Sequence, residues 1–235
     1  MKKPTNTTII VLALIAFVCI CWNIVFPSGA WRYRTTVRVE TPEGIISGSA
    51  VREVEAYYGP RLMGATQGGH AHLANGEAVV VNLGKRGVLF ALMRGDSFGT
   101  DYGWGVVYSA FRKGDAGWQT TRDRVLYYRS LKNAKVELTP EQYPEFVYFK
   151  NLNDQRTVRK VKDFEGVFGA GVKLKDVTVE MTDDPVTWEV VKWLKWLPAR
   201  KGVPGYFGYE PGHPHAYDPT GLRLSGGEFS KGKYW

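Results

Sequence analysis

The feature that most constrains this chain is an apolar run near its amino terminus. Ile9 to Phe26 are 18 consecutive residues, of which only Asn23 is strongly polar. A helix of this length rises about 1.5 Å per residue and spans roughly 27 Å, which crosses the hydrocarbon core of a bilayer. We therefore predict a cytoplasmic tail over residues 1–8 and a transmembrane anchor over residues 9–26.

A cleaved signal peptide and a lipoprotein signal compete with this interpretation. Lys2 and Lys3, with Ser28 and Ala30 at an A-x-A-like spacing, fit a signal peptide whose removal would leave a secreted domain. However, the run is longer than the about 7–15 apolar residues of a usual signal peptide. Bulky residues precede both cysteines of the run, whereas a lipoprotein signal needs a small one. An uncleaved anchor is favoured.

The basic residues on the two sides of the apolar run only weakly determine its orientation in the membrane. Lys2 and Lys3 on one side face Arg32, Arg34 and Arg38 on the other, so the count of basic residues is nearly balanced. A short basic tail directly before an apolar segment normally stays in the cytoplasm. The remainder of the chain is therefore expected outside it.

Aromatic residues mark the downstream end of the anchor. Trp22, Trp31 and Tyr33 lie where amphipathic rings favour the headgroup region, so we predict that they contact the membrane interface. Both cysteines fall inside the anchor, and the domain therefore has neither a structural disulfide nor Cys-ligated zinc.

Beyond the anchor, the pattern predicts one α+β domain over residues 27–198, rich in antiparallel hairpins. Arg34–Val39 alternates in polarity and a turn at residues 41–44 leads to the extended run Ile45–Tyr57, which indicates a hairpin. Residues 59–76 read as a Gly-rich loop. Further expected elements are a buried hairpin of Glu77–Leu83 with Val88–Met93, a short helix within Thr121–Leu131, a one-turn capping box at Thr139–Gln142, and strands at Phe146–Lys150, Thr157–Val161 and Val172–Met181.

The clearest helix of the domain is predicted from Pro185 to Leu197. Asp184 is placed to cap it and Pro198 to end it. It is amphipathic, and its apolar stripe consists of Val186, Val190, Trp193, Leu194 and Leu197. The helix either packs on the sheet or lies in the membrane interface, in which case Trp188 and Trp196 enter the headgroups. Residues 199–235 form a tail rich in Gly, Pro and aromatic residues, in which no long regular element is expected.

The four histidines occur as two His-x-His pairs. In an extended segment, residues i and i+2 project to the same side, so His70 with His72, and His213 with His215, each present two imidazoles. Together they match a four-nitrogen site for Zn²⁺ or Cu²⁺, with Asp218 as an additional ligand. Against this hypothesis, both pairs lie in Gly/Pro-rich segments.

No catalytic signature of comparable strength is present. Residues 47–50 lack the flanking glycines of a nucleophile elbow, and residues 166–173 lack the Lys-Ser/Thr end of a phosphate loop. The acidic pair Asp183–Asp184 is explained by capping. A non-enzymatic protein is expected.

The charge of the chain bears on its partners. There are 31 basic and 23 acidic side chains, a net charge of +8, and Lys2 and Lys3 account for two of the positive charges. The remaining +6 is spread along the domain, which favours an ordinary basic surface or attraction to anionic headgroups over a nucleic-acid partner.

Several stretches resemble a family of uncharacterised bacterial proteins that carry an N-terminal membrane segment. The resemblance rests on residues 41–51, 76–84 and 89–92, and on residues 157–161, 168–174 and 177–187. It implies a bacterial, envelope-facing protein. Together with the predicted anchor, this leads us to expect a single-pass protein of the bacterial inner membrane, with its domain in the periplasm and a non-enzymatic binding or structural role among other envelope proteins. The resemblance supplies no activity, cofactor or site residue. Metal binding through the histidine pairs is the alternative function.

Overall fold

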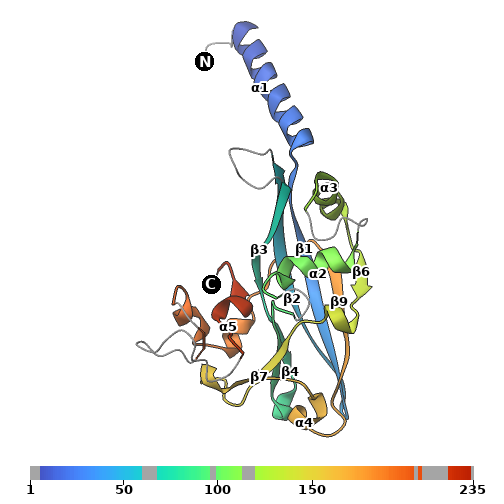
Figure 1. Ribbon diagram of the computed structural model, residues 1–235, viewed down its shortest axis with the longest axis vertical. Helices are drawn as coiled ribbons and strands as arrows, with labels where there is room; N and C mark the ends of the chain where they lie inside the picture. The colour runs from blue at the N-terminus through green and yellow to red at the C-terminus, as the bar shows by residue number, and fades with distance from the viewer. Residues whose placement is uncertain are drawn as a thin grey trace.

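The computed structural model describes residues 6–59, 68–95, 99–112, 120–203, 206–207 and 222–233. Helix α1, Asn6–Val25, projects from one end of a strand-rich body (Figure 1). Its apolar window, Thr7–Val25, has a mean hydropathy of 2.7 and none of it is buried against the rest of the chain. The predicted helix is thus confirmed, and its length and composition suit a membrane span.

The body is built on a six-stranded antiparallel sheet. The two strands that come first in the sequence, β1 and β2, form the predicted hairpin. This hairpin is 14 residue pairs long and closes at the Thr41–Gly44 turn. Gly44 has φ +126°, a left-handed conformation that glycine adopts without a side-chain penalty. In spatial order the strands are β10 (Ser230–Lys231), β3 (Gly68–Glu77), β2 (Gly44–Gly59), β1 (Ser28–Thr41), β9 (Lys173–Thr182) and β6 (Lys135–Glu137).

Alternation along β1 separates the two faces of this sheet. Trp31, Tyr33 and Val37 lie on a buried inner face. On the outer face, Arg32 and Arg38 are half-exposed and form ion pairs across the strands, Arg32 with Glu53 on β2 and Arg38 with Asp176 on β9. The polarity pattern read from the sequence therefore sets which side of the sheet faces the core.

A second, four-stranded sheet covers the part of the inner face farthest from α1. Its strands, in the order β4, β5, β7 and β8, are all antiparallel. Gly48 on β2 lies against the backbone of Val80, where a methyl group would overlap the carbonyl oxygen. The strands are β4 (Val79–Asn82), β5 (Val88–Ala91), β7 (Phe146–Phe149) and β8 (Val158–Lys160), with the short helical turn η1 (Gly84–Arg86) closing the β4–β5 hairpin.

Two helices cover the inner face nearer α1. Helix α3, Arg122–Ser130, is the predicted short helix, and Thr121 caps it by accepting a bond from the backbone N–H of Arg124. Helix α2, Tyr102–Ala110, falls on the aromatic, glycine-interrupted segment that the sequence left unassigned. Its glycines bring it close to the sheet, since a methyl group on Gly103 would press on Leu73 of β3. One turn of α-helix, α4 (Phe164–Phe168), precedes β9, and the capping box at Thr139 starts the turn η2 (Pro140–Gln142).

The segment after β9 corrects the prediction of one long helix over residues 185–197. Helix α5 is only Val190–Trp193, followed by the turn η4, Leu197–Arg200. The carboxylate of Glu77 accepts the backbone N–H groups of Glu189 and Val190, each at 2.7 Å, and so fixes the start of α5 five residues later than expected. Asp184 does not cap a helix and instead pairs with Arg34 on β1.

The apolar residues of this segment are nevertheless buried. Val190, Leu194 and Leu197 are fully covered and pack on the far side of the four-stranded sheet, against Phe90 and Val147. Part of the predicted tail joins them, including Phe207, Leu224 and Phe229. The turn η5, Gly226–Glu228, leads into β10, so the described part of residues 199–235 packs on the domain.

We predict that Gly48→Ala destabilises the protein by about 1–3 kcal/mol, because the added methyl group forces β2 and β4 apart. Thermal and urea unfolding of the detergent-solubilised chain measure the loss. Ser49→Ala, at the neighbouring exposed position on the opposite face, is the matched control and should leave the midpoint unchanged. Equal stabilities for the two variants would contradict this packing.

Candidate functional site

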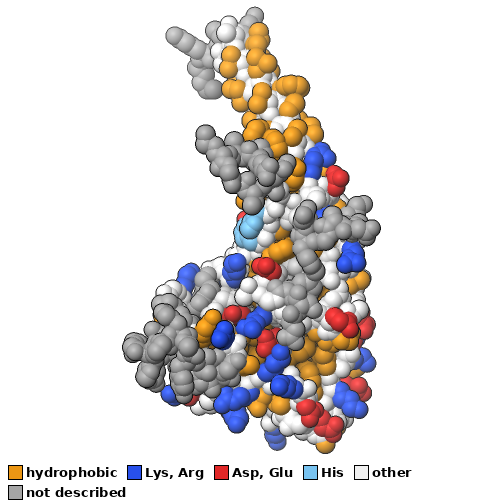
Figure 2. All heavy atoms as spheres, viewed as in Figure 1, with side chains coloured by type: hydrophobic (Ala, Val, Ile, Leu, Met, Phe, Trp, Pro, Cys, Tyr) orange, Lys and Arg blue, Asp and Glu red, His pale blue; other side chains and the backbone are white. Residues whose placement is uncertain are grey.

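A groove runs beside β3. Figure 2 shows a histidine, in pale blue, at the surface between the apolar helix and the wider part of the body. The groove consists of two adjoining cavities of about 860 Å³ and 310 Å³. Both are lined by His70 and Ala71 of β3 and by Asp101 and Trp104 at the start of α2. The larger cavity continues toward α3 and the smaller one toward β10.

The strand β3 itself corrects the expected loop over residues 59–76. Residues 68–77 form a strand that pairs along its length with β2. The opposite edge of β3 is paired at both ends: the N–H of Gly69 donates to the carbonyl of Thr120 at 2.8 Å, and Gly76 and Glu77 pair with β10. Between these two points no described strand pairs with that edge.

The alternating direction of the backbone hydrogen bonds along β3 shows which of its N–H and C=O groups face the groove. In an antiparallel sheet, successive residues direct their N–H and C=O groups to opposite neighbours. Gly69 directs its N–H away from β2, so Ala71 and Leu73 do the same, while His70 and His72 bond to β2. As far as the structure describes the chain, the groove-facing edge therefore carries the backbone donors and acceptors of two residues, Ala71 and Leu73.

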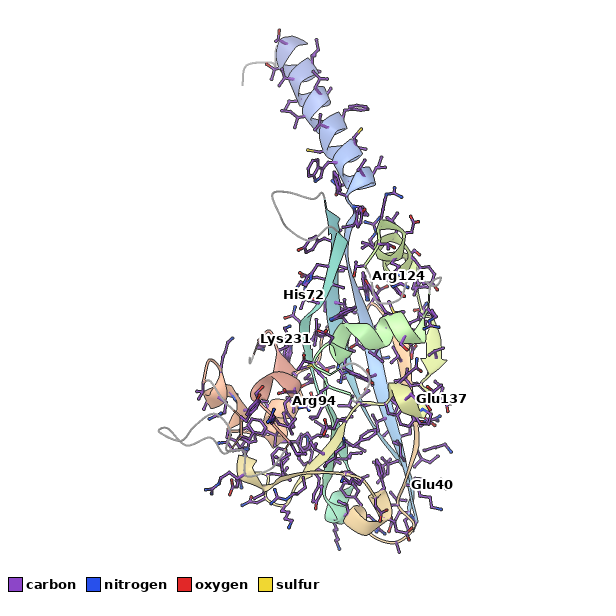
Figure 3. The ribbon with its side chains drawn as sticks, in the orientation of Figure 1. Glu40, His72, Arg94, Arg124, Glu137 and Lys231 are labelled. Atoms are coloured by element: carbon purple, nitrogen blue, oxygen red, sulfur yellow. The ribbon has the colours of Figure 1, made fainter. Side chains whose placement is uncertain are left out.

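The side chains around this edge are of mixed type. On the inner side lie Trp104, which is half-buried, and Met93, which is buried. Trp104 is held by an edge-on contact with Tyr108 at 5.3 Å between ring centroids. Lys231, labelled below His72 in Figure 3, lines the end of the groove near Glu228.

The histidine pair of β3 lies on the outer face of the sheet. His70 is exposed, and its ring lies over that of His72 with centroids 5.6 Å apart. The Nε2 atom of His72 is 3.8 Å from a carboxylate oxygen of Glu55 on β2. The predicted common side of His70 and His72 is confirmed. Within the described ranges, no three His, Cys, Asp or Glu residues gather as a metal site.

The second histidine pair, His213 and His215, lies outside the described residues, as does Asp218. The four-nitrogen site for Zn²⁺ or Cu²⁺ thus stays a prediction.

Three of the aromatic residues predicted at the membrane interface are structural. Trp31 is 6% exposed, stacks on Tyr108 and contacts the ring of Tyr128 at a tilt. Tyr33 is fully buried, and its hydroxyl donates to the carbonyl of Gly103. They face α2 and α3 because odd-numbered residues of β1 point inward.

Trp196 is also held inside the domain, since its indole N–H donates to the carbonyl of Leu152 at 2.8 Å. Trp188 is half-buried. Trp22 alone of the five is exposed, at 54%, on α1.

Two charged residues, Arg52 of β2 and Glu77 of β3, are buried in the domain. Arg52 of β2 is fully buried, its Nε donates to the backbone carbonyl of Glu77 at 2.9 Å, and its guanidinium lies 6.0 Å from the ring centre of Tyr33. Burial raises the pKa of the Glu77 carboxyl, although the two N–H groups that it accepts oppose the rise. Burial likewise raises the pKa of Tyr33 and of Tyr102.

Sequence reasoning missed the open edge of β3. The sequence does carry a strand pattern here, because residues 70–73 alternate between polar and apolar as His, Ala, His, Leu. However, the neighbouring glycines at 68, 69 and 76 favoured a loop. Trp104 and Asp101 were missed because α2 was not assigned.

The chain matches no protein-family model, no curated protein and no solved structure.

We predict that amide hydrogens alternate in exchange rate along β3. Ala71 and Leu73 direct their N–H groups into the groove and should exchange at least about tenfold faster than His70 and His72, which donate to β2. Residue-resolved NMR exchange on the full chain in detergent micelles measures this. Uniform protection over residues 70–73 would contradict an open edge.

Proposed function

We propose that this protein is a single-pass, membrane-anchored component of the bacterial envelope whose periplasmic domain binds an extended polypeptide along β3, without catalysis. The observation that carries the proposal is that Ala71 and Leu73 line the groove and that, among the described residues, no strand pairs with their groove-facing edge. Added strands are a common way in which sheets bind extended peptides.

The energetics favour a bound strand over an empty edge. Ala71 and Leu73 are 5% and 6% exposed, so water reaches their polar groups only through the groove. A peptide strand would supply up to four backbone hydrogen bonds, each of which contributes about 0.5–1.5 kcal/mol net. The window is short, because Thr120 and β10 already occupy the two ends of the edge. It therefore suits a segment of few residues within a longer chain.

The side chains around the edge set a preference for the occupant. Alternate side chains of an added strand would point to opposite faces of the sheet. Those on the inner side would contact Trp104 and Met93, which favours apolar residues. Those on the outer side would lie near His70 and His72, where polar residues are tolerated. The occupant is thus expected to alternate in polarity.

Anchoring restricts where such a partner can be. The guanidinium Nε of Arg122 on α3 donates to the carbonyl of Ile24 in α1 at 2.9 Å, and Arg129 donates to the carbonyl of Ser28 at 3.0 Å. These contacts tie α3, and with it the groove, to the end of the anchor. Envelope proteins with segments close to the bilayer are the natural partners.

We expect the full chain to remain in the membrane pellet after alkaline carbonate extraction, since the exposed apolar side chains of α1 need lipid. Protease added to spheroplasts should digest the domain, while protease added to inverted vesicles should leave it intact. A soluble, shortened chain would show instead that the apolar segment is cleaved.

Strand addition is tested by Ala71→Pro, which removes one groove-facing N–H and none that bonds to β2. Full-length protein in detergent is screened against an array of random ten-residue peptides, and those that bind are titrated. We expect Ala71→Pro to weaken their binding by at least about tenfold.

Ala71→Ser, which keeps the backbone donor, is the matched control and should bind as the wild type does. Circular dichroism melting of both variants verifies folding, and Trp104→Ala, which leaves β3 unchanged, tests the inner side of the groove independently. Absence of peptide binding, or equal binding by the Pro and Ser variants, would contradict strand addition.

A further inference from the structure

A cleft separates the last turns of the apolar helix α1 from helix α3. Its volume is about 410 Å³. The walls of the cleft include Ile20 and Ile24 of α1 and Arg122, Leu126 and Arg129 of α3. Of the residues that line it, Arg122 alone also lines the groove along β3. The cleft is therefore a surface feature of the junction between helix and domain, distinct from the peptide edge.

Helix α3 has two faces of different character. Val125 and Tyr128 are buried against the inner face of the large sheet. Arg122, Leu126 and Arg129 follow one another at i, i+4 and i+7, which places them together on another face, and all three line the cleft. Leu126 is half-buried there, between the two cations. The wall that α3 gives to the cleft is thus amphipathic.

Two hydrogen bonds fix the height of this wall along α1. The Nε of Arg122 donates to the carbonyl of Ile24 at 2.9 Å, and Ile24 belongs to the apolar window Thr7–Val25. Ile20 lies one turn deeper, about 6 Å along the helix axis. If α1 spans the bilayer as proposed, the cleft extends from the level of the headgroups to the beginning of the acyl chains.

The two guanidinium groups keep donors for a ligand. Each donates to one backbone carbonyl, Arg122 to Ile24 and Arg129 to Ser28, and a guanidinium has five N–H groups. Within the described ranges Arg129 has no carboxylate partner, while Arg122 has Asp123 at 3.5 Å, whose side chain is 83% exposed. A phosphodiester is the acceptor that such planar donors bind best.

Exposed aromatic residues lie at the same end of the molecule. Tyr57 of β2 pairs with Ser28, three residues beyond α1, and is 51% exposed. Trp22, in the last turn but one of α1, is 54% exposed. Amphipathic rings of this kind favour the headgroup region of a bilayer. This end of the domain thus combines the aromatic, cationic and apolar groups that a membrane interface accommodates.

We propose that the cleft between α1 and α3 binds a phospholipid with an anionic headgroup, drawn from the leaflet next to the domain. Its phosphate accepts hydrogen bonds from Arg122 and Arg129, and its acyl chain lies along Ile20 and Leu126. A free anion would leave those apolar side chains uncovered, whereas a lipid covers them. The proposal rests on the membrane anchoring proposed above and is independent of strand addition at β3.

The test places the photocrosslinking residue p-benzoylphenylalanine at position 126 of the full-length chain, in nanodiscs of equal parts phosphatidylglycerol and phosphatidylcholine. Irradiation should attach lipid to residue 126, and mass spectrometry of the intact chain identifies which lipid. We expect phosphatidylglycerol adducts to exceed phosphatidylcholine adducts about fivefold. The same residue in place of Ile45, which is 53% exposed at the far end of the β1–β2 hairpin, is the control and should give no lipid adduct.

The charge contribution is measured with two double variants that remove the same number of cations. Arg122→Gln with Arg129→Gln should reduce the phosphatidylglycerol excess to about equal labelling of the two lipids. Lys85→Gln with Lys173→Gln removes two exposed cations from the far end of the domain and should leave the excess at about fivefold. Asp123→Asn removes the carboxylate beside Arg122 and should raise the excess severalfold.

Each outcome decides the proposal. No adduct at residue 126, equal labelling by the two lipids in the unaltered cleft, or the same excess in both double variants overturns it. The mass of the chain also shows whether the apolar segment is intact, so a shortened chain would overturn the anchoring together with this inference. Should the arginine double variant lose the circular dichroism spectrum of the folded chain, Asp123→Asn decides, and an unchanged excess in that variant overturns the proposal.

Discussion

The register of β1 against β2 is the constraint on which the rest of the structure depends. It is fixed at one end by the Thr41–Gly44 turn, where the Thr41 hydroxyl donates to the Gly44 carbonyl at 2.8 Å. A slip of one residue would move Arg32, Arg34 and Arg38 to the inner face and expose Trp31 and Tyr33. The helices and the second sheet both pack on that inner face, so every later element takes its position from this pairing.

Local pattern was enough to predict the elements that carry clear alternation, turns or caps in their own sequence. The β1–β2 hairpin, the β4–β5 hairpin, α3 and strands β7 to β9 were all readable from alternation, turns or caps. The strand β3 was not, because glycines at 68 and 69 resemble a loop and the strand is specified by its pairing with β2 and Thr120. The prediction of a helix over residues 185–197 was wrong for a related reason. Its apolar spacing predicted burial correctly, but the distant Glu77 carboxylate fixed where α5 begins.

Buried polar contacts connect the layers of the domain. Tyr33 on β1 lies opposite Arg52 on β2, Arg52 donates to the Glu77 backbone on β3, and the Glu77 carboxylate binds the start of α5. Removing one member would leave another charge or donor buried without compensation, which costs more than the intact contact contributes. This chain of contacts explains why the open edge of β3 can stay in place without a neighbouring strand. Its residues are held by pairing with β2, and the end of β3 is joined to the start of α5 through Glu77.

The junction between α1 and the sheet determines what the domain can reach. The N–H of Phe26 still bonds to Trp22 in the helix, and the carbonyl of Pro27 already accepts from Tyr58 on β2. Backbone hydrogen bonds therefore continue from the apolar helix to the first residues of the sheet, and Arg122 adds a further contact at Ile24. These contacts hold the domain close to the end of α1. The groove consequently keeps a fixed orientation to α1, so under the proposed anchoring a partner would have to reach it close to the membrane.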